Sequence, residues 1–140
     1  MTCHAAFGEA TGALPSGRRA GRPLANGLTP ANGQDRRGPT AALNSVASTA
    51  PGRCAGNGIN VNLTLDAGSF DGADAGTTLG GLVRGYFARG GMQLQTNILD
   101  PQVLREAIAK PDAHPWLLVR VSGYSAYFND LSPGMKQEIL

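Results

Sequence analysis

The sequence has few cysteines, few histidines and little net charge, and each shortage argues against a class of protein. Its 140 residues include two cysteines and two histidines. Cys3 and Cys54 each lack a second cysteine at metal-ligand spacing, so we expect thiols in a reducing compartment, neither zinc ligands nor nucleophiles. The net charge of +2 argues against a chain built to bind nucleic acid, and the arginine clusters within residues 18–37 lack aromatic neighbours that would stack on bases.

Long apolar runs are also absent. No segment is long enough to span a membrane, and residues 1–7 lack the basic and then apolar order of a secretory signal. We therefore expect a cytoplasmic protein with no membrane contact. The scattered cysteines and histidines separately predict no metal site, and no bound cofactor is expected.

Glycine and proline are abundant, and many of them lie in residues 1–38, a segment called the leader below. The leader has almost no periodic apolar pattern. Taken by itself, such a segment cannot bury enough surface to offset the entropy of ordering, so it looks like a linker. A folded domain is expected over residues 39–140.

Residues 39–140 carry alternating helix and strand signals. Helix starts are marked by Pro39, Asp100-Pro101 and Ser132-Pro133. Apolar residues at helical spacing, including both Tyr86 and Phe87 on the buried stripe, predict another helix that Gly90-Gly91 ends. Alternation predicts strands over 59–65 and 92–98. This is an α/β pattern whose short links favour neighbouring strands in one sheet, and whose unpaired sheet edges indicate part of something larger.

Two features of this domain leave alternatives open. The polar side of the second strand, Gln93, Gln95 and Asn97, could line a cavity or meet solvent, since either satisfies side-chain amides. His114 stands before a proline between a helix and a strand, which is typical of a loop residue, although a proton-transfer role is the alternative.

Residues 117–128 predict two short strands that meet at Ser122-Gly123. A glycine at such a tip is commonly explained by a turn that needs a positive φ angle. The amino-acid sequence of the segment adds a second explanation. Residues 120–128, Arg-Val-Ser-Gly-Tyr-Ser-Ala-Tyr-Phe, resemble the glycyl radical signature of the pyruvate formate-lyase-like enzymes, which share an Arg-Val-Ser/Ala-Gly-Tyr core.

The resemblance implies that Gly123 carries a stored radical. Loss of one hydrogen atom from its α-carbon leaves an unpaired electron between a donating amide nitrogen and a withdrawing carbonyl, and the absence of Cβ lets that centre flatten. Oxygen would add to this carbon and cut the chain, so anaerobic chemistry is implied. The loop around Gly123 would be supported by Arg120, Val121, Ser122, Tyr124 and Ser125.

The resemblance extends from about residue 7 to residue 140. Residues 12–27 are similar to the family's Thr-Pro-Asp-Gly-Arg-Arg/Lys-Ala-Gly-Glu-Pro-Leu-Ala-Asp-Gly segment, with departures at Leu14, Ser16, Arg22 and Asn26. Residues 86–97 resemble its Tyr-Phe-x-x-Gly-Gly-x-x-x-Gln-x-Asn motif. The implied fold is the C-terminal part of a ten-stranded α/β barrel that holds the glycine loop at its centre and orders the leader. The family's catalytic cysteine motif is absent, and neither Cys3 nor Cys54 matches it.

The resemblance also implies partners and a reaction class. A radical S-adenosylmethionine activating enzyme would install the glycyl radical, which would then pass to a cysteine outside this sequence. Family reactions include formate acetyltransferase, lyase, dehydratase and decarboxylase chemistry, and departures at residues 58–64 and at Gly91-Met92 favour reactions other than diol dehydration.

Three interpretations follow from these observations. The chain is a C-terminal piece of such an enzyme, or a freestanding spare part that restores an oxygen-damaged partner enzyme, or a binding module with an accidental motif. The extent of the match favours the first.

Overall fold

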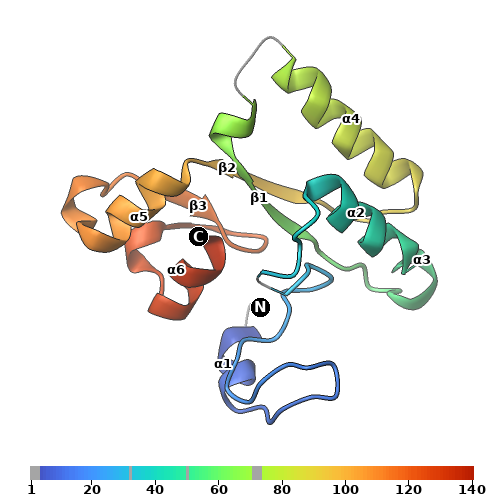
Figure 1. Cartoon of the computed structure of the whole chain (residues 1–140), viewed down its shortest axis with the longest axis horizontal. Helices are drawn as coiled ribbons and strands as arrows, with labels where there is room; N and C mark the ends of the chain where they lie inside the picture. The colour runs from blue at the N-terminus through green and yellow to red at the C-terminus, as the bar shows by residue number, and fades with distance from the viewer. Residues whose placement is uncertain (1–3, 32, 50, 71–73) are drawn as a thin grey trace.

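The computed structural model describes residues 4–31, 33–49, 51–70 and 74–140, which form helices and strands in alternation (Figure 1). The helices are α1 (His4–Glu9), α2 (Pro39–Ser48), α3 (Pro51–Cys54), α4 (Ala75–Ala88), α5 (Pro101–Ala109) and α6 (Pro133–Ile139). The strands are β1 (Asn62–Asp66), β2 (Gln95–Leu99), β3 (Leu118–Arg120) and β4 (Ser125–Tyr127). The predicted α/β class is confirmed. No helix of the described residues is long and apolar enough to cross a bilayer.

Strands β1 and β2 form a parallel pair, in register from Asn62 opposite Gln95 to Asp66 opposite Leu99. The alternation predicted for β1 is present, since Leu63 and Leu65 are buried and Thr64 is exposed. Helices α2 and α4 lie on one side of this pair (Figure 1). Together they enclose an apolar cluster, the sheet core, of Leu43, Val46, Ala47, Val61, Leu63, Leu65 and Tyr86.

Both strands begin later than the sequence predicts, at Asn62 and Gln95 instead of residues 59 and 92. The reason is a side chain that replaces the first rung of the ladder. The amide nitrogen of Val61 donates to Oε1 of Gln93 at 3.0 Å. The backbone ladder starts only after this bond.

Tyr86 and Phe87 were both predicted to lie on the buried stripe of α4, and for Phe87 this is wrong. Tyr86 is 2% exposed, whereas Phe87 is 45% exposed. Adjacent helical residues point about 100° apart, so a narrow contact face buries only one of them. The Tyr86 hydroxyl donates to the carbonyl of Gln93 at 3.3 Å. Gly91 lies against the ring, where a Cβ would collide with it.

Tyr86 is expected to make stability fall at alkaline pH. Burial raises the pKa of its phenol above 10.0, and a backbone hydrogen bond at Met92 lowers it by less. The unfolded chain therefore loses this proton first, and stability present below about pH 10 declines as pH rises through the raised pKa. Tyr86→Phe should cost about 1 kcal/mol at neutral pH, because the hydrogen bond is lost, and make the alkaline decline shallower.

Urea unfolding between pH 8 and 11 would measure this effect. Tyr127→Phe is the matched control, because Tyr127 is 52% exposed. An alkaline decline of the same slope in Tyr86→Phe and wild type would contradict the assignment.

Helices α5 and α6 pack with β3 and β4 around a second apolar cluster, the hairpin core. Its buried members are Leu104, Ala107, Leu117, Val119, Val121, Phe128, Leu131 and Ile139. All three predicted helix starts are present, and those at Asp100 and Ser132 have side-chain capping bonds. Asp100 Oδ1 accepts from the amide of Gln102 at 2.7 Å, and Ser132 Oγ accepts from the amide of Met135 at 3.4 Å.

The expectation that neighbouring strands share one sheet is right for β1 and β2 and wrong for β3. Strands β3 and β4 form a separate antiparallel pair, with Val119 opposite Ala126. Strand β3 approaches β2, but the side chain of Asn97 takes both backbone groups of Arg120. That contact occupies the edge at which a backbone ladder would form.

The leader contains a helix that its sequence did not predict, α1, and many turns. Arg18 orders one of these turns, since its guanidinium donates to the carbonyls of Gly8, Gly12 and Arg22. His4 contacts the Glu138 carboxylate of α6 and so joins the two ends of the described chain. The division of the chain at residue 38 stays a prediction.

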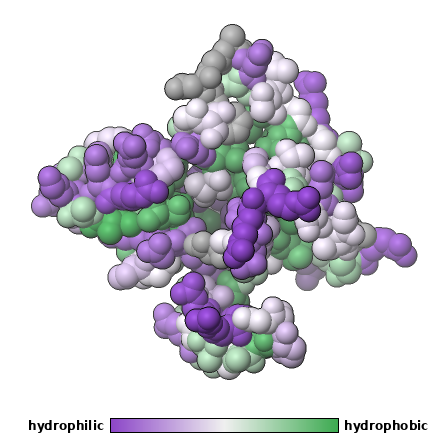
Figure 2. Space-filling model, in the orientation of Figure 1, coloured by the Kyte–Doolittle hydropathy of each residue, from purple (hydrophilic) through white to green (hydrophobic). Residues whose placement is uncertain are grey.

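Surface hydropathy follows this arrangement. The part of the molecule formed by α5, α6, β3 and β4 is called the hairpin lobe. In the space-filling view a stripe of apolar residues runs along the lobe that contains α5, below a row of hydrophilic residues (Figure 2). Exposed large apolar residues of this lobe include Ile108, Trp116, Leu118 and Tyr127.

Candidate functional site

The β3–β4 hairpin, residues 118–127, presents Gly123 at its tip and is called the glycine hairpin below. The turn is closed by a bond from the amide of Val121 to the carbonyl of Tyr124, at 2.9 Å. Gly123 has φ 79°, and a Cβ built on it would meet no heavy atom within 4 Å beyond its neighbours. The predicted turn and its positive φ are confirmed, and the α-carbon is sterically open.

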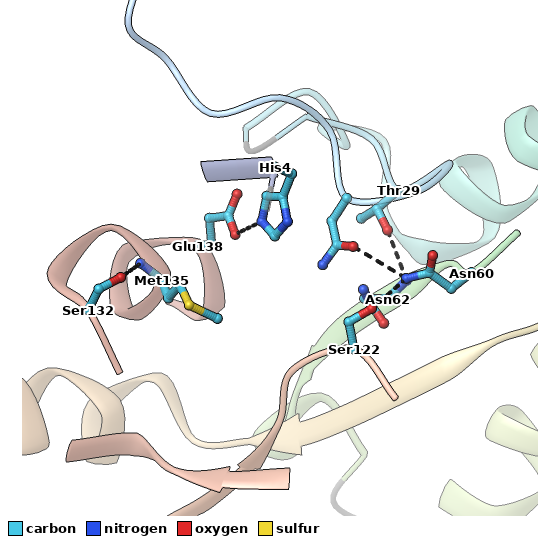
Figure 3. Close-up of polar contacts among 9 residues, drawn as sticks. His4, Thr29, Asn60, Asn62, Ser122, Ser132, Met135 and Glu138 are labelled. Carbon is cyan, nitrogen blue, oxygen red and sulfur yellow. Dashed lines mark hydrogen bonds and ion pairs between the residues drawn. The ribbon is translucent and has the colours of Figure 1, made fainter. Parts of the chain in front are cut away.

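Side chains from distant segments hold the glycine hairpin in place. Gln95 Oε1 accepts from the amide of Gly123 at 3.2 Å. Asn97 Nδ2 donates to the Arg120 carbonyl at 2.7 Å, and its Oδ1 accepts from the Arg120 amide at 3.0 Å. Asn60 Nδ2 donates to Ser122 Oγ at 2.9 Å (Figure 3). The turn is therefore bonded through Arg120, Ser122 and Gly123 to the part of the chain that contains β1 and β2, called the sheet lobe below.

The alternatives left open for the polar side of the second strand were a cavity wall and solvent, and Asn97 lies in the wall of the cavity described below. Gln93 bonds to the amide of Val61, while Gln95 and Asn97 bond to the glycine hairpin. All three side chains thus form hydrogen bonds with backbone groups, a role that neither alternative included. Their positioning role was missed by sequence reasoning. The available signal was that all three are amides, which can donate and accept at once.

Asn97→Asp is expected to weaken this attachment. Aspartate keeps an acceptor for the Arg120 amide but cannot donate to the Arg120 carbonyl. Its second carboxylate oxygen would face the carbonyl oxygen of Arg120, and the two oxygens repel each other. A cost of about 1 kcal/mol in the free energy of unfolding follows from the loss of one hydrogen bond in an exposed setting. Urea denaturation would measure it, with Asn57→Asp in an exposed loop as the control. Equal stability of the two variants would contradict the role of Asn97.

The predicted supporting residues divide into three kinds. Val121 is 7% exposed and anchors the turn in the hairpin core. Ser122 accepts the bond from Asn60, and Arg120 Nη1 donates to Ser125 Oγ at 3.3 Å. Tyr124 is 45% exposed and supports the turn through its carbonyl.

Cysteine and histidine lie away from the glycine hairpin. Cys54 is exposed in α3, at the far side of α2 from the hairpin (Figure 1), and its thiol donates to the Thr49 carbonyl at 3.7 Å. Cys3 lies outside the described residues. His114 is in a loop, as predicted, 3.2 Å from the Glu106 carboxylate. The described residues contain no group of three His, Cys, Asp or Glu side chains that could hold a metal ion.

A cavity of about 1150 Å³ lies between the leader, the sheet and α6. Arg19, Arg22 and Asn26 contribute to its leader wall, and Arg120 and Val121 bring the base of the glycine turn to its border. Its volume exceeds that of typical ligand pockets, roughly 300–1,000 Å³. The described chain therefore leaves a large space beside the glycine turn.

Fold and site together define an α/β domain that presents one glycine on a hydrogen-bonded turn. A family model described as "Glycine radical" matches residues 24–129, and the chain belongs to this family. It is a glycine radical domain similar to those of the pyruvate formate-lyase-like glycyl radical enzymes, as the resemblance of its sequence implied.

Individual relatives agree with this assignment. The chain is 37% identical to the PFL-like enzyme TdcE of Escherichia coli, over 100% of the chain and 19% of the relative. It is 37% identical to trans-4-hydroxy-L-proline dehydratase of Clostridioides difficile, over 99% of the chain and 17% of the relative. The chain thus spans about a fifth of the length of these curated relatives.

Solved structures give the same result. The chain is similar to the glycerol-bound B12-independent glycerol dehydratase of Clostridium butyricum, with a TM-score of 0.90 and 38% identity, over 98% of this chain and 17% of that one. A glycyl radical enzyme of Archaeoglobus fulgidus is similar with a TM-score of 0.88 and 38% identity, over 99% of this chain and 18% of that one.

Proposed function

We propose that Gly123 stores the radical and that this chain is the radical-storing part of an anaerobic, cytoplasmic glycyl radical enzyme. The observation that carries the proposal is the open α-carbon of Gly123, at φ 79° on a turn bonded to the sheet lobe. The domain would stand within a ten-stranded barrel, completed by sequence outside this chain.

The proposed activation removes one hydrogen atom from the α-carbon of Gly123. A separate activating enzyme supplies S-adenosylmethionine and iron–sulfur chemistry, so this chain needs no cofactor of its own. In the domain taken by itself, no atom shields the side of Gly123 on which a Cβ would stand. The stored radical then takes a hydrogen atom from a catalytic cysteine elsewhere in the barrel, and that cysteine attacks the substrate.

The sequence of this domain does not distinguish one reaction class from another. Identities are 37% to the PFL-like enzyme TdcE, 37% to the hydroxyproline dehydratase and 34% to indoleacetate decarboxylase of Tractidigestivibacter scatoligenes. Similar domains thus accompany different reactions, in agreement with a shared storage role. The preference for a reaction other than diol dehydration stays a prediction.

Electron paramagnetic resonance tests the storage role. The full chain, incubated without oxygen with a matching activating enzyme, reductant and S-adenosylmethionine, is expected to give a doublet from one α-hydrogen. Protein labelled with α-deuterated glycine should lose the splitting, and air should cut the chain at Gly123. A chain with native circular dichroism but no doublet would overturn the proposal.

A further inference from the structure

Gln95 makes direct contact with the residue that would hold the radical. We propose that Gln95 tunes the electronic stability of a radical on Gly123, beyond holding the turn in position. This inference rests on the proposed storage role of Gly123.

The position of Gln95 is fixed by its own backbone. It begins β2 opposite Asn62, and its amide nitrogen donates to the carbonyl of Val61 at 2.8 Å. From there its side chain reaches the turn, where Oε1 accepts from the amide of Gly123 at 3.2 Å. Only the oxygen end of the side chain can accept from an N–H group, so this contact determines which way the amide faces.

The opposite orientation of the amide would set the Nε2 donor against the amide of Gly123, which is also a donor. The hydrogen bond to Gly123 is therefore made by the oxygen of the Gln95 side chain, and its Nε2 faces away from the turn.

The remaining hairpin contacts act on neighbouring residues. Asn60 bonds to the Ser122 hydroxyl and Asn97 to the backbone of Arg120. Among the side-chain hydrogen bonds of the described residues, the one from Gly123 to Gln95 is the bond that involves the glycine itself. Asn60 therefore makes a contact that only positions the turn, whereas Gln95 also contacts the residue that would hold the radical.

The electronic effect follows from how a glycyl radical is stabilised. The amide nitrogen gives electron density to the α-carbon, while the carbonyl withdraws it. An acceptor on the N–H polarises that bond and raises the electron density on nitrogen. Donation to the α-carbon then increases, spin density leaves that carbon, and the coupling of its remaining hydrogen decreases. Gln95 should consequently favour the radical over intact glycine.

Three variants of the full chain test this inference after anaerobic activation. Gln95→Leu removes the acceptor, Gln95→Glu keeps one at the same length, and Asn60→Leu removes a positional contact. Gln95→Leu should show a larger α-hydrogen splitting than wild type and a decay of the doublet about fivefold faster. That factor corresponds to about 1 kcal/mol, the net contribution of one hydrogen bond. Gln95→Glu should restore both values, and Asn60→Leu should lower only the amount of radical formed.

The outcomes distinguish this inference from the proposed function. A wild-type doublet with unchanged splitting and lifetime in Gln95→Leu would overturn the role of Gln95 and leave Gly123 as the storage residue. If Gln95→Leu does not fold, Gln95→Asn keeps the amide but shortens its reach, and the same changes are expected. Folded Gln95 variants that cannot be activated, beside an activated Asn60→Leu, would assign Gln95 to presentation alone and overturn the electronic role.

Discussion

Gly123→Ala is expected to abolish the radical doublet completely. A methyl group on the α-carbon hinders the flattening on which delocalisation depends, and it occupies the side from which the α-carbon is open. Alanine at a φ of 79° also costs about 1–2 kcal/mol, because the left-handed region crowds its Cβ. Spin counting on the activated full chain measures the loss.

Gly33→Ala is the matched control for this substitution. Gly33 also has φ 79°, and a Cβ there would likewise meet nothing within 4 Å. Both variants therefore carry the same backbone strain, and only one changes the proposed storage residue. Wild-type spin in Gly33→Ala beside none in Gly123→Ala would assign the radical. A doublet of wild-type intensity in Gly123→Ala would place the radical elsewhere.

Phe128→Ala is expected to cause the largest loss of stability. Phe128 is 0% exposed, and it lies in the hairpin core with Leu104 and Val119. Its amide donates to the Leu117 carbonyl at 2.8 Å, and Lys136 Nζ lies 5.8 Å from the ring centroid. Removal of a buried phenylalanine ring costs about 3–5 kcal/mol, which is a large share of a typical domain's 5–15 kcal/mol.

Urea denaturation of Phe128→Ala and Phe87→Ala would measure this difference. Phe87 is 45% exposed, so its truncation should cost about 1 kcal/mol or less. Activation should fall along with stability in Phe128→Ala, since the glycine turn is anchored in the same core through Val121. Similar losses in the two variants would mean that the hairpin core does not support the fold as described.

Local signals in the sequence predicted local features well. The caps at Asp100 and Ser132 and the glycine turn each depend on residues within a few positions of one another, and all are present. The attachment of the turn was not predictable in this way. Asn97 and Arg120 are 23 residues apart, Gln95 and Gly123 are 28 apart, and Asn60 and Ser122 are 62 apart. Bonds between a side chain and a distant backbone group leave no periodic pattern.

The same distant contacts explain the incorrect strand pairing. Short connections favour neighbouring strands, but they do not show whether a side chain will occupy the sheet edge first. Asn97 does so, and β3 pairs with β4 instead. The burial of Tyr86 but not Phe87 has a similar origin, because the width of the face that α4 buries depends on what packs against it.

The contact between His4 and Glu138 has a consequence for oxygen damage. A cut at Gly123 would separate residues 124–140 from the rest of the chain covalently. Phe128, Leu131 and Ile139 would still lie in the hairpin core, and Glu138 would still meet His4 of the opposite end. Residues 124–140 would stay bound to the rest of the domain through these contacts. Oxygen would thus end the chemistry of the domain while leaving its shape in place, and any repair would have to displace a bound segment.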